Sequence, residues 1–137
     1  MGLFSALRVS ASGLTAQRTR LDTIASNLAN ATTTRTPEGG PYRRREVVFT
    51  PQAEGAEPGA ESGVTVTEIR EDARQPQMVY DPAHPDANPD GYVAMPNVSV
   101  LEEMVDLISA SRAYEANVTA MNVEKGMMQK ALDIGRG

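Results

Sequence analysis

Hydrophobic residues recur at heptad spacing through the last third of the chain, roughly from Asn97 to Ile134. Steps of three and four residues lead from Val100 to Leu132, and most of these positions are apolar. This period keeps one side of a helix facing a partner helix. A second apolar stripe lies about half a turn away. A helix that is apolar on two sides is expected to be buried on two sides, so the pattern predicts one partner inside the chain and a second one outside it.

The first thirty residues show a matching pattern, which predicts a helix over residues 3–29. Apolar side chains recur along it in steps of three and four residues, and we expect this stripe to pair with the C-terminal helix as a coiled coil. The predicted helix-pairing seam comprises Leu7, Leu14, Leu21, Leu28, Met104, Leu107, Tyr114, Val118, Met121, Met128 and Leu132.

The remaining faces of the two helices favour contacts between chains. The back of the first helix carries small, uncharged side chains, which suit close packing better than a solvated surface does. Exposure of a long apolar stripe on the other helix would mark an interaction surface. The residues predicted to pack between subunits are Ser12, Ala16, Thr19, Thr23, Val105, Ile108, Val123, Met127 and Ile134.

The middle of the chain changes character. Threonine, proline and glycine follow the first helix, and residues 51–63 have the composition of a loop. β-Branched and aromatic runs over 46–50, 64–69 and 77–80 predict short strands. The fold class is therefore mainly α: two long terminal helices, over 1–30 and 97–137, form one discontinuous coiled-coil domain, and residues 31–96 form a small β-hairpin or extended-loop insertion.

Both inner helix ends carry recognisable signals. Asn27 and Asn30 are expected to form the turn that ends the first helix. Ser99 and Glu102 have the spacing of a capping box, in which each residue satisfies a free backbone group at the start of the second helix.

Composition excludes several function classes. The net charge of −5 disfavours a general nucleic-acid binder, and the absence of cysteine removes thiolate chemistry. The arginines at 43–45 favour a solvated edge or pairing with acidic residues over phosphate binding. Residues 86–97 begin like a calcium-binding loop, but Asn97 stands where that loop needs glutamate. We find no arrangement of catalytic residues, so no enzymatic activity, metal or other cofactor is expected.

No membrane span is expected from the sequence, because no apolar run approaches the ~18 residues that a span needs. No secretory signal peptide is expected, because the N-terminus has no apolar core preceded by a basic patch. We therefore expect no direct insertion into a membrane.

Several spaced motifs resemble the axial rod and hook proteins of bacterial flagella, and among them the short proximal rod proteins. The resemblance runs almost end to end and is weakest over 51–75. The motifs are Ser10-Ala-Ser-Gly-Leu-Thr-Ala-Gln17, Ser26-Asn-Leu-Ala-Asn30, Gly39-Gly-Pro-Tyr-Arg-Arg44, Tyr80-Asp-Pro-Ala-His-Pro85, the run from Glu103 to Asn117, and Met127-Met-Gln-Lys-Ala-Leu132.

The resemblance implies a structural subunit of the rod, the drive shaft that crosses the periplasm, surrounds the export channel and transmits torque. It implies export through the flagellar type III apparatus without a cleaved signal peptide. The implied partners are other rod subunits, the hook–basal body complex protein at the rod base and the surrounding rings, with no nucleic acid among them.

Two alternatives remain open at this point. Another rod or hook subunit shares both ends of this chain but usually carries more sequence in the middle. A soluble coiled-coil export adaptor or chaperone, which binds an amphipathic helix in a groove, would also use a helix with two apolar sides.

Overall fold

The computed structural model describes residues 2–52 and 63–136. Two helices, α1 (Leu3–Ala29) and α2 (Val100–Arg136), enclose four short strands in the chain order: β1 (Arg45–Pro51), β2 (Val64–Glu71), β3 (Gln77–Tyr80) and β4 (Tyr92–Met95). The predicted bounds of the first helix and of the three predicted strands are close to these. The predicted loop over 51–63 lies largely outside the described residues.

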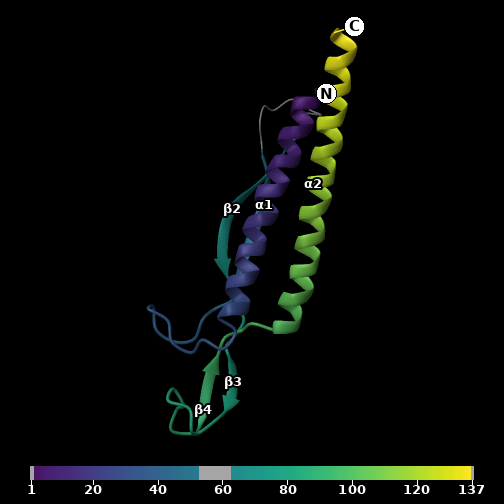
Figure 1. Cartoon of the computed structure of the whole chain (residues 1–137). Coiled ribbons are helices and arrows are strands. Elements are labelled where there is room, and N and C mark those ends of the chain that lie inside the picture. Colours follow the sequence, from purple (N-terminus) through teal and green to yellow (C-terminus); the bar gives the residue numbers. More distant parts are fainter. Residues whose placement is uncertain (1, 53–62, 137) are drawn as a thin grey trace.

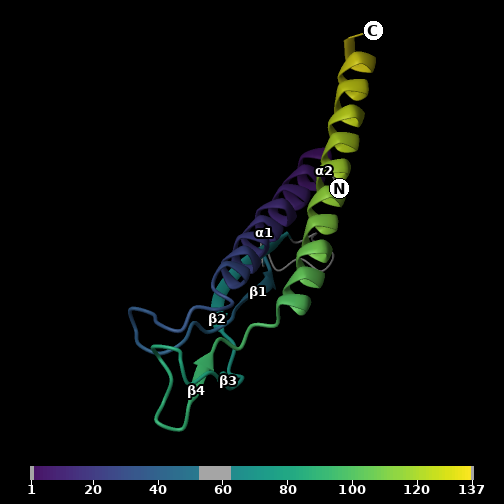
Figure 2. The same cartoon turned by 60° about the horizontal axis from the view of Figure 1, so that its bottom comes forward.

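The molecule is elongated, because the two helices lie side by side and run in opposite directions (Figure 1). α1 has 27 residues and α2 has 37, which at ~1.5 Å per residue corresponds to about 40 Å and 55 Å. The C-terminal end of α2 therefore extends past the start of α1, as both views show (Figure 2). The structure confirms a mainly helical fold with a small β insertion, whereas the coiled-coil geometry of the pair stays a prediction.

The line along which the helices meet is more polar than the sequence pattern predicted. Ser10 Oγ donates to Glu124 Oε1 at 3.0 Å, and Asn27 donates to the buried Glu103 at 3.2 Å. Gly13 lies directly against the side chain of Asn117. The buried and half-buried positions of α2 include one series that steps by three and four residues: Glu103, Leu107, Ala110, Tyr114, Asn117, Met121, Glu124 and Met128.

The observed seam on α2 is thus turned by about one residue from the predicted one. Leu107, Tyr114, Met121 and Met128 belong to both. Met104, Val118 and Leu132 are instead exposed, by 50%, 37% and 63%. The physical reason is that polar side chains of α2 have specific partners across the seam. Glu103 contacts Asn27 and Arg44, Glu124 accepts from Ser10, and Asn117 packs against Gly13. These residues therefore occupy the seam, and the neighbouring apolar side chains turn outward.

Gly13 permits a close approach of the two helices. A Cβ atom at this position would lie 3.0–3.2 Å from the amide group of Asn117. We expect Gly13→Ala to be nearly neutral, because a small shift of Asn117 is offset by the better helix propensity of alanine. Gly13→Val adds two more carbons at this point and should cost about 1–3 kcal/mol. Thermal unfolding followed by circular dichroism measures both; equal effects of the two variants would contradict a tight crossing.

β1 and β2 form an antiparallel hairpin with a register shift between Val48 and Phe49. The hairpin packs along α1 (Figure 1), over the face of small residues that the sequence pattern assigned to contacts between subunits. Ser12 Oγ accepts a hydrogen bond from the Val64 backbone N–H at 3.0 Å, and Ala16 and Thr23 are only 2% and 9% exposed. Small side chains let the strands approach, so the chain covers this face itself.

β3 and β4 form a second antiparallel hairpin beyond the inner ends of the helices (Figure 1). Its turn requires Gly91, which has φ 86° and whose Cβ would lie 2.8 Å from the ring of Tyr80. Sequence patterning did not predict β4, because a four-residue strand that ends in alanine and methionine has little β signature. Val93 and Val98 form a small buried core near this hairpin, and the two rings of Tyr80 and Tyr92 pack edge to face.

α2 begins at Val100, three residues later than the pattern suggested. Ser99 Oγ accepts from the Glu102 N–H at 3.4 Å, as expected of a cap. The Glu102 carboxylate lies 3.6 Å from Arg74. Asn97 stays outside the helix, because its side chain is engaged with other loops.

Candidate functional site

Asn27 is the centre of a buried polar cluster that joins α1 to β1 and α2. It is 1% exposed, and both ends of its amide are fully used. Its Nδ2 donates to the Arg45 carbonyl at 2.8 Å and to Glu103 Oε2 at 3.2 Å. Its Oδ1 accepts from the Tyr42 hydroxyl at 2.8 Å and from the Arg45 N–H at 3.0 Å. Asn27 therefore fixes where the hairpin leaves the helix pair.

Glu103 is the acidic partner within this cluster. Its side chain is fully buried and forms an ion pair with Nε of Arg44. Arg44 also lies 3.3 Å from Asp72, 3.4 Å from Glu46 and 3.6 Å from Asp106. A buried carboxylate without such a partner would be strongly destabilising, so Glu103 of α2 depends on Arg44, the residue directly before β1.

The charges around Arg44 set its protonation. Burial lowers the pKa of the Arg44 guanidinium, but the hydrogen bond and charge of Glu103, together with Asp72, outweigh it and raise the pKa above its usual value. Arg44 stays charged. Arg44, in the run of arginines at 43–45, thus pairs with acidic residues, as the sequence suggested. Its main partner is Glu103 of α2.

Two further asparagines extend the same cluster. Asn97 Oδ1 accepts from the Arg44 N–H at 2.7 Å, and its Nδ2 donates to the carbonyls of Asp72 and Arg74 at 3.2 and 2.9 Å. Asn30 caps the end of α1 by donating to the Ser26 carbonyl at 2.8 Å. Asn30 thus occupies the predicted turn, whereas Asn27 lies inside the last turn of the helix and binds the hairpin.

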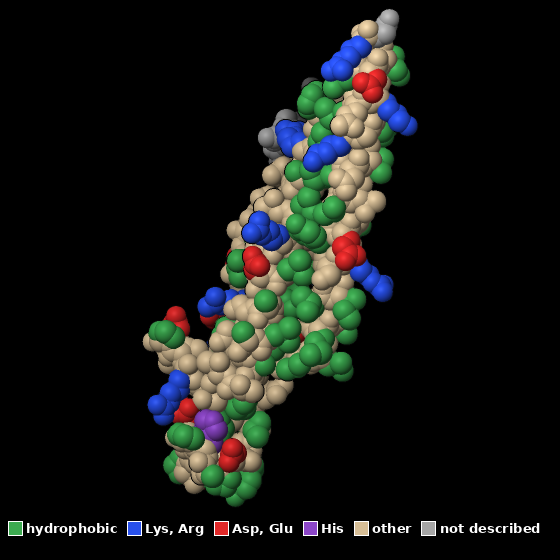
Figure 3. Space-filling model, in the orientation of Figure 1, with side chains coloured by type: hydrophobic (Ala, Val, Ile, Leu, Met, Phe, Trp, Pro, Cys, Tyr) green, Lys and Arg blue, Asp and Glu red, His purple; other side chains and the backbone are tan. Residues whose placement is uncertain are grey.

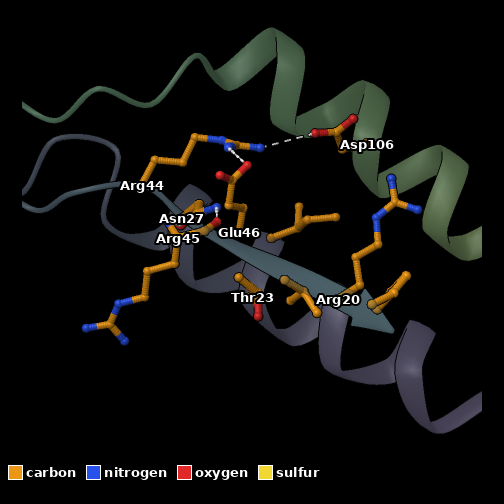
Figure 4. Close-up of a pocket in the computed structure, with 10 residues that line it drawn as sticks. Arg20, Thr23, Asn27, Arg44, Arg45, Glu46 and Asp106 are labelled. Atoms are coloured by element: carbon orange, nitrogen blue, oxygen red, sulfur yellow. Dashed lines mark hydrogen bonds and ion pairs between the residues drawn. The ribbon is translucent and has the colours of Figure 1, made fainter. Parts of the chain in front are cut away.

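A pocket of about 190 Å³ lies beside this cluster, between α1, β1 and α2 (Figure 4). Its labelled side chains include Arg20, Thr23, Arg45 and Asp106, and its wall combines polar groups with Ile24, Val47 and Phe49. The residues that the structure describes contain no group of three potential metal ligands. We regard the pocket as the open side of the junction that holds the hairpin against the helices.

The second notable surface is an apolar band on the outside of α2. Figure 3 shows hydrophobic side chains along the helix pair, with charged side chains spaced between them. The apolar band comprises side chains of α2 that are 37–81% exposed: Leu101, Met104, Val105, Ile108, Val118, Val123, Met127, Leu132 and Ile134.

In the single chain, the nine apolar side chains of this band are thus open to contact with another molecule. The chain exposes 9228 Å², whereas a compact monomer of its mass exposes about 6,900 Å². Exposed apolar patches of this length mark interaction sites.

The predicted contact residues therefore separate into two groups. Val105, Ile108, Val123, Met127 and Ile134 are exposed and available to another chain. Ser12, Ala16, Thr19 and Thr23 lie along the face where the chain's own hairpin packs. The role of the second group in contacts between chains stays a prediction, and the contacts within the chain do not favour it. On α1, Leu7, Leu14, Leu21 and Leu28 are half-buried. By the 100° turn per residue they flank the seam on the side away from the hairpin.

Two aspartates in the connecting loops, Asp72 and Asp86, make the stability of the fold depend on pH. The hydrogen bonds from Arg74, and its charge, lower the pKa of Asp72. The Thr34 hydroxyl and Arg35 lower the pKa of Asp86 and tie the loop after α1 to the loop after β3. A carboxylate with a lowered folded-state pKa stabilises the fold above its unfolded-state pKa, about 3.9, and that stabilisation is lost as pH falls through the folded value.

We therefore expect the thermal unfolding midpoint to fall as pH is lowered from 5 to 3. Asp86→Asn should reduce this dependence, because it removes one of the two groups. Asp90→Asn, in the same loop, is the matched control. An unchanged pH profile in Asp86→Asn would show that the Thr34–Asp86 and Arg35–Asp86 contacts do not stabilise the folded state.

Within the described ranges, no helix is long and apolar enough to cross a membrane.

Comparison with known proteins identifies the family. Residues 7–35 match the model of the flagella basal body rod protein family, and residues 90–134 match the C-terminal model of flagellar basal body rod FlgEFG proteins. The chain is 47% identical to the flagellar basal-body rod protein FlgC of Borreliella burgdorferi, with all of both chains covered. It is 50% identical to that of Bacillus subtilis and 46% identical to that of Escherichia coli, with 99% of this chain and all of the relative covered in each case. The chain belongs to the FlgC family of flagellar basal-body rod proteins.

Proposed function

We propose that this chain is the rod subunit whose terminal helices form the wall of the periplasmic drive shaft. Its membership of the family makes it a structural component of the flagellar basal body, and we propose no enzymatic role for it. The finer assignment includes polymerisation around the export channel, transmission of torque and export without a cleaved signal peptide. The proposed partners are other rod subunits, the hook–basal body complex protein at the rod base, the surrounding rings and the type III export apparatus.

One observation carries this proposal: the single chain leaves the nine large apolar side chains of the apolar band 37–81% exposed. Burying one large aliphatic side chain contributes about 1.5–3 kcal/mol. Contacts with other chains that cover the band would therefore add substantially to the stability of the subunit. A contact of unlike surfaces, repeated from chain to chain, builds a helical polymer when it does not close.

The proposal is tested by isolating basal bodies with detergent and high salt and measuring which chains remain. We expect this chain to remain in fixed ratio to other rod components. A strain without it should lack the rod and should not swim, and the wild-type chain should restore both. Recovery of the chain only as a soluble, monodisperse helical protein would instead support the adaptor or chaperone alternative.

A further inference from the structure

The end of α2 that extends past α1 creates an apolar notch. Its walls are Leu3 and Phe4 from the start of α1 and Met128, Ala131 and Leu132 from α2, around a space of about 360 Å³. Phe4 is 75% exposed and Leu132 is 63% exposed. No part of the chain described by the structure fills this notch. Its lining is apolar, so its occupant must present aliphatic or aromatic side chains.

The charges near the notch are mostly basic. By the 100° turn per residue, the exposed Lys125 and Arg136 lie at the edge of the face of α2 that carries Met128 and Leu132, whereas Lys130 and Asp133 lie farther round the helix. A surface that is apolar at its centre and basic at its edge fits a partner that is apolar at its centre and acidic at its edge.

The other end of α2 has that complementary character. Its first turns expose Leu101, Met104, Val105 and Ile108. Glu102 and Asp106 lie between these residues, at 3.6 Å from Arg74 and Arg44, where each stays partly exposed. Polar residues such as Arg112, Glu115 and Thr119 separate this end from the notch. The start of α2 thus presents apolar side chains next to acidic groups, which complements the apolar notch and its basic edge.

We propose that the notch binds the first turns of the C-terminal helix of another rod-family chain, placed head to tail along the axis of α2. This inference rests on the function proposed above and names the partner of its apolar surface. The helix start in question belongs to a C-terminal region, residues 90–134, whose family model is named for other rod proteins, so it is not confined to this chain. The carboxyl end of one helix dipole would lie beside the amino end of the next, which is favourable.

The same charges oppose the symmetric arrangement. If two copies paired notch to notch, Lys125 and Arg136 of one chain would face those of its partner. Like charges placed together across an interface disfavour that pairing. A head-to-tail contact avoids this repulsion and leaves a free notch and a free helix start at opposite ends, as an extending polymer requires.

The test places a photoreactive benzoylphenylalanine in the notch of the full chain, at Leu132, in cells that assemble flagella. After irradiation, washed basal bodies are digested and the linked peptides are sequenced. We expect the Leu132 probe to link to the start of the C-terminal helix of a rod-family chain, in this chain the segment 101–108. A probe at Thr119, in the polar middle of α2, is the matched control and should not link to that segment.

Gln129 provides a second probe position if the Leu132 variant fails to assemble, because it is exposed and polar and lies beside the notch residue Met128. In this background Lys125→Glu should reduce the linked product at least severalfold, whereas Lys125→Arg should leave it unchanged. Links from the notch to another notch, to a ring protein or to the middle of a helix would overturn the proposed contact.

The outcomes also separate this inference from the proposed function. A chain that is present in basal bodies at the wild-type ratio, but whose notch links elsewhere, contradicts only the head-to-tail contact. A chain that is absent from washed basal bodies, even without a probe, contradicts the function on which the inference rests.

Discussion

Asn27→Ala is expected to destabilise the fold more than any other single truncation of an uncharged polar side chain. It removes four hydrogen bonds and leaves the Arg45 backbone, the Tyr42 hydroxyl and Glu103 with fewer partners in a buried place. Each buried group left unsatisfied costs about 1–3 kcal/mol, so the loss should reach about 3 kcal/mol or more. For a chain of this size that lowers the unfolding midpoint by about 10 °C or more. Thermal unfolding of the purified full chain measures it.

Two controls separate hydrogen bonding from packing. Asn27→Asp keeps the shape but replaces the donor that faces Glu103 by a second carboxylate, so it should be as damaging as alanine. Asn122→Ala, at an exposed position of α2, should change the midpoint little. If Asn27→Asp were as stable as the natural chain, the hydrogen bonds that Asn27 donates to Glu103 and to the Arg45 carbonyl would not stabilise the fold.

Ile108→Glu is expected to leave the stability of the single chain unchanged but to abolish its assembly into the rod. Ile108 is 57% exposed in the single chain, so a charge there is expected to change unfolding by at most about 0.5 kcal/mol. In a polymer the same carboxylate would enter an apolar contact, where an unpaired charge is strongly unfavourable. Motility assays and the yield of the chain in washed basal bodies are the measurements.

Thr119→Glu is the matched control for Ile108, since both are exposed on α2 but Thr119 lies in its polar middle. We expect this variant to assemble and to swim. Motility of Ile108→Glu at the natural level would show that the apolar patch at the start of α2 makes no contact between chains. Failure of both variants would mean that the contact extends over the whole helix.

The bounds of the helices and of β1, β2 and β3 could be predicted from local sequence, because heptad spacing, a cap at Ser99 and β-branched runs are local signals. The residues in the seam could not. Glu103 and Glu124 look like solvated residues until Asn27 and Arg44, or Ser10, are placed beside them. Those partners are separated by 76, 59 and 114 positions in the chain, and no local pattern reports contacts at that separation.

The same reasoning explains the small residues of α1. Their size correctly predicted that something packs closely against Ser12 and Ala16, but not what it is. The hairpin that does so is held by contacts at both ends, the Val64–Ser12 bond and the bonds between Arg45 and Asn27. Both depend on the path of the chain between the helices.

The position of the β1–β2 hairpin has a consequence for the shape of any assembly. It packs on one side of α1, so another chain can lie directly against the helix pair only on the other side, where the leucines of α1 and the apolar band of α2 remain open. Chains joined through that side alone form a layer one molecule thick. Each chain is narrower on the surface of the layer formed by the bare helices and wider on the surface that carries the hairpins. A layer of such subunits curves towards the surface on which the subunits are narrower. The hairpin thus acts as a spacer that gives a set of otherwise straight helices a common direction of bending, and so an inner and an outer surface.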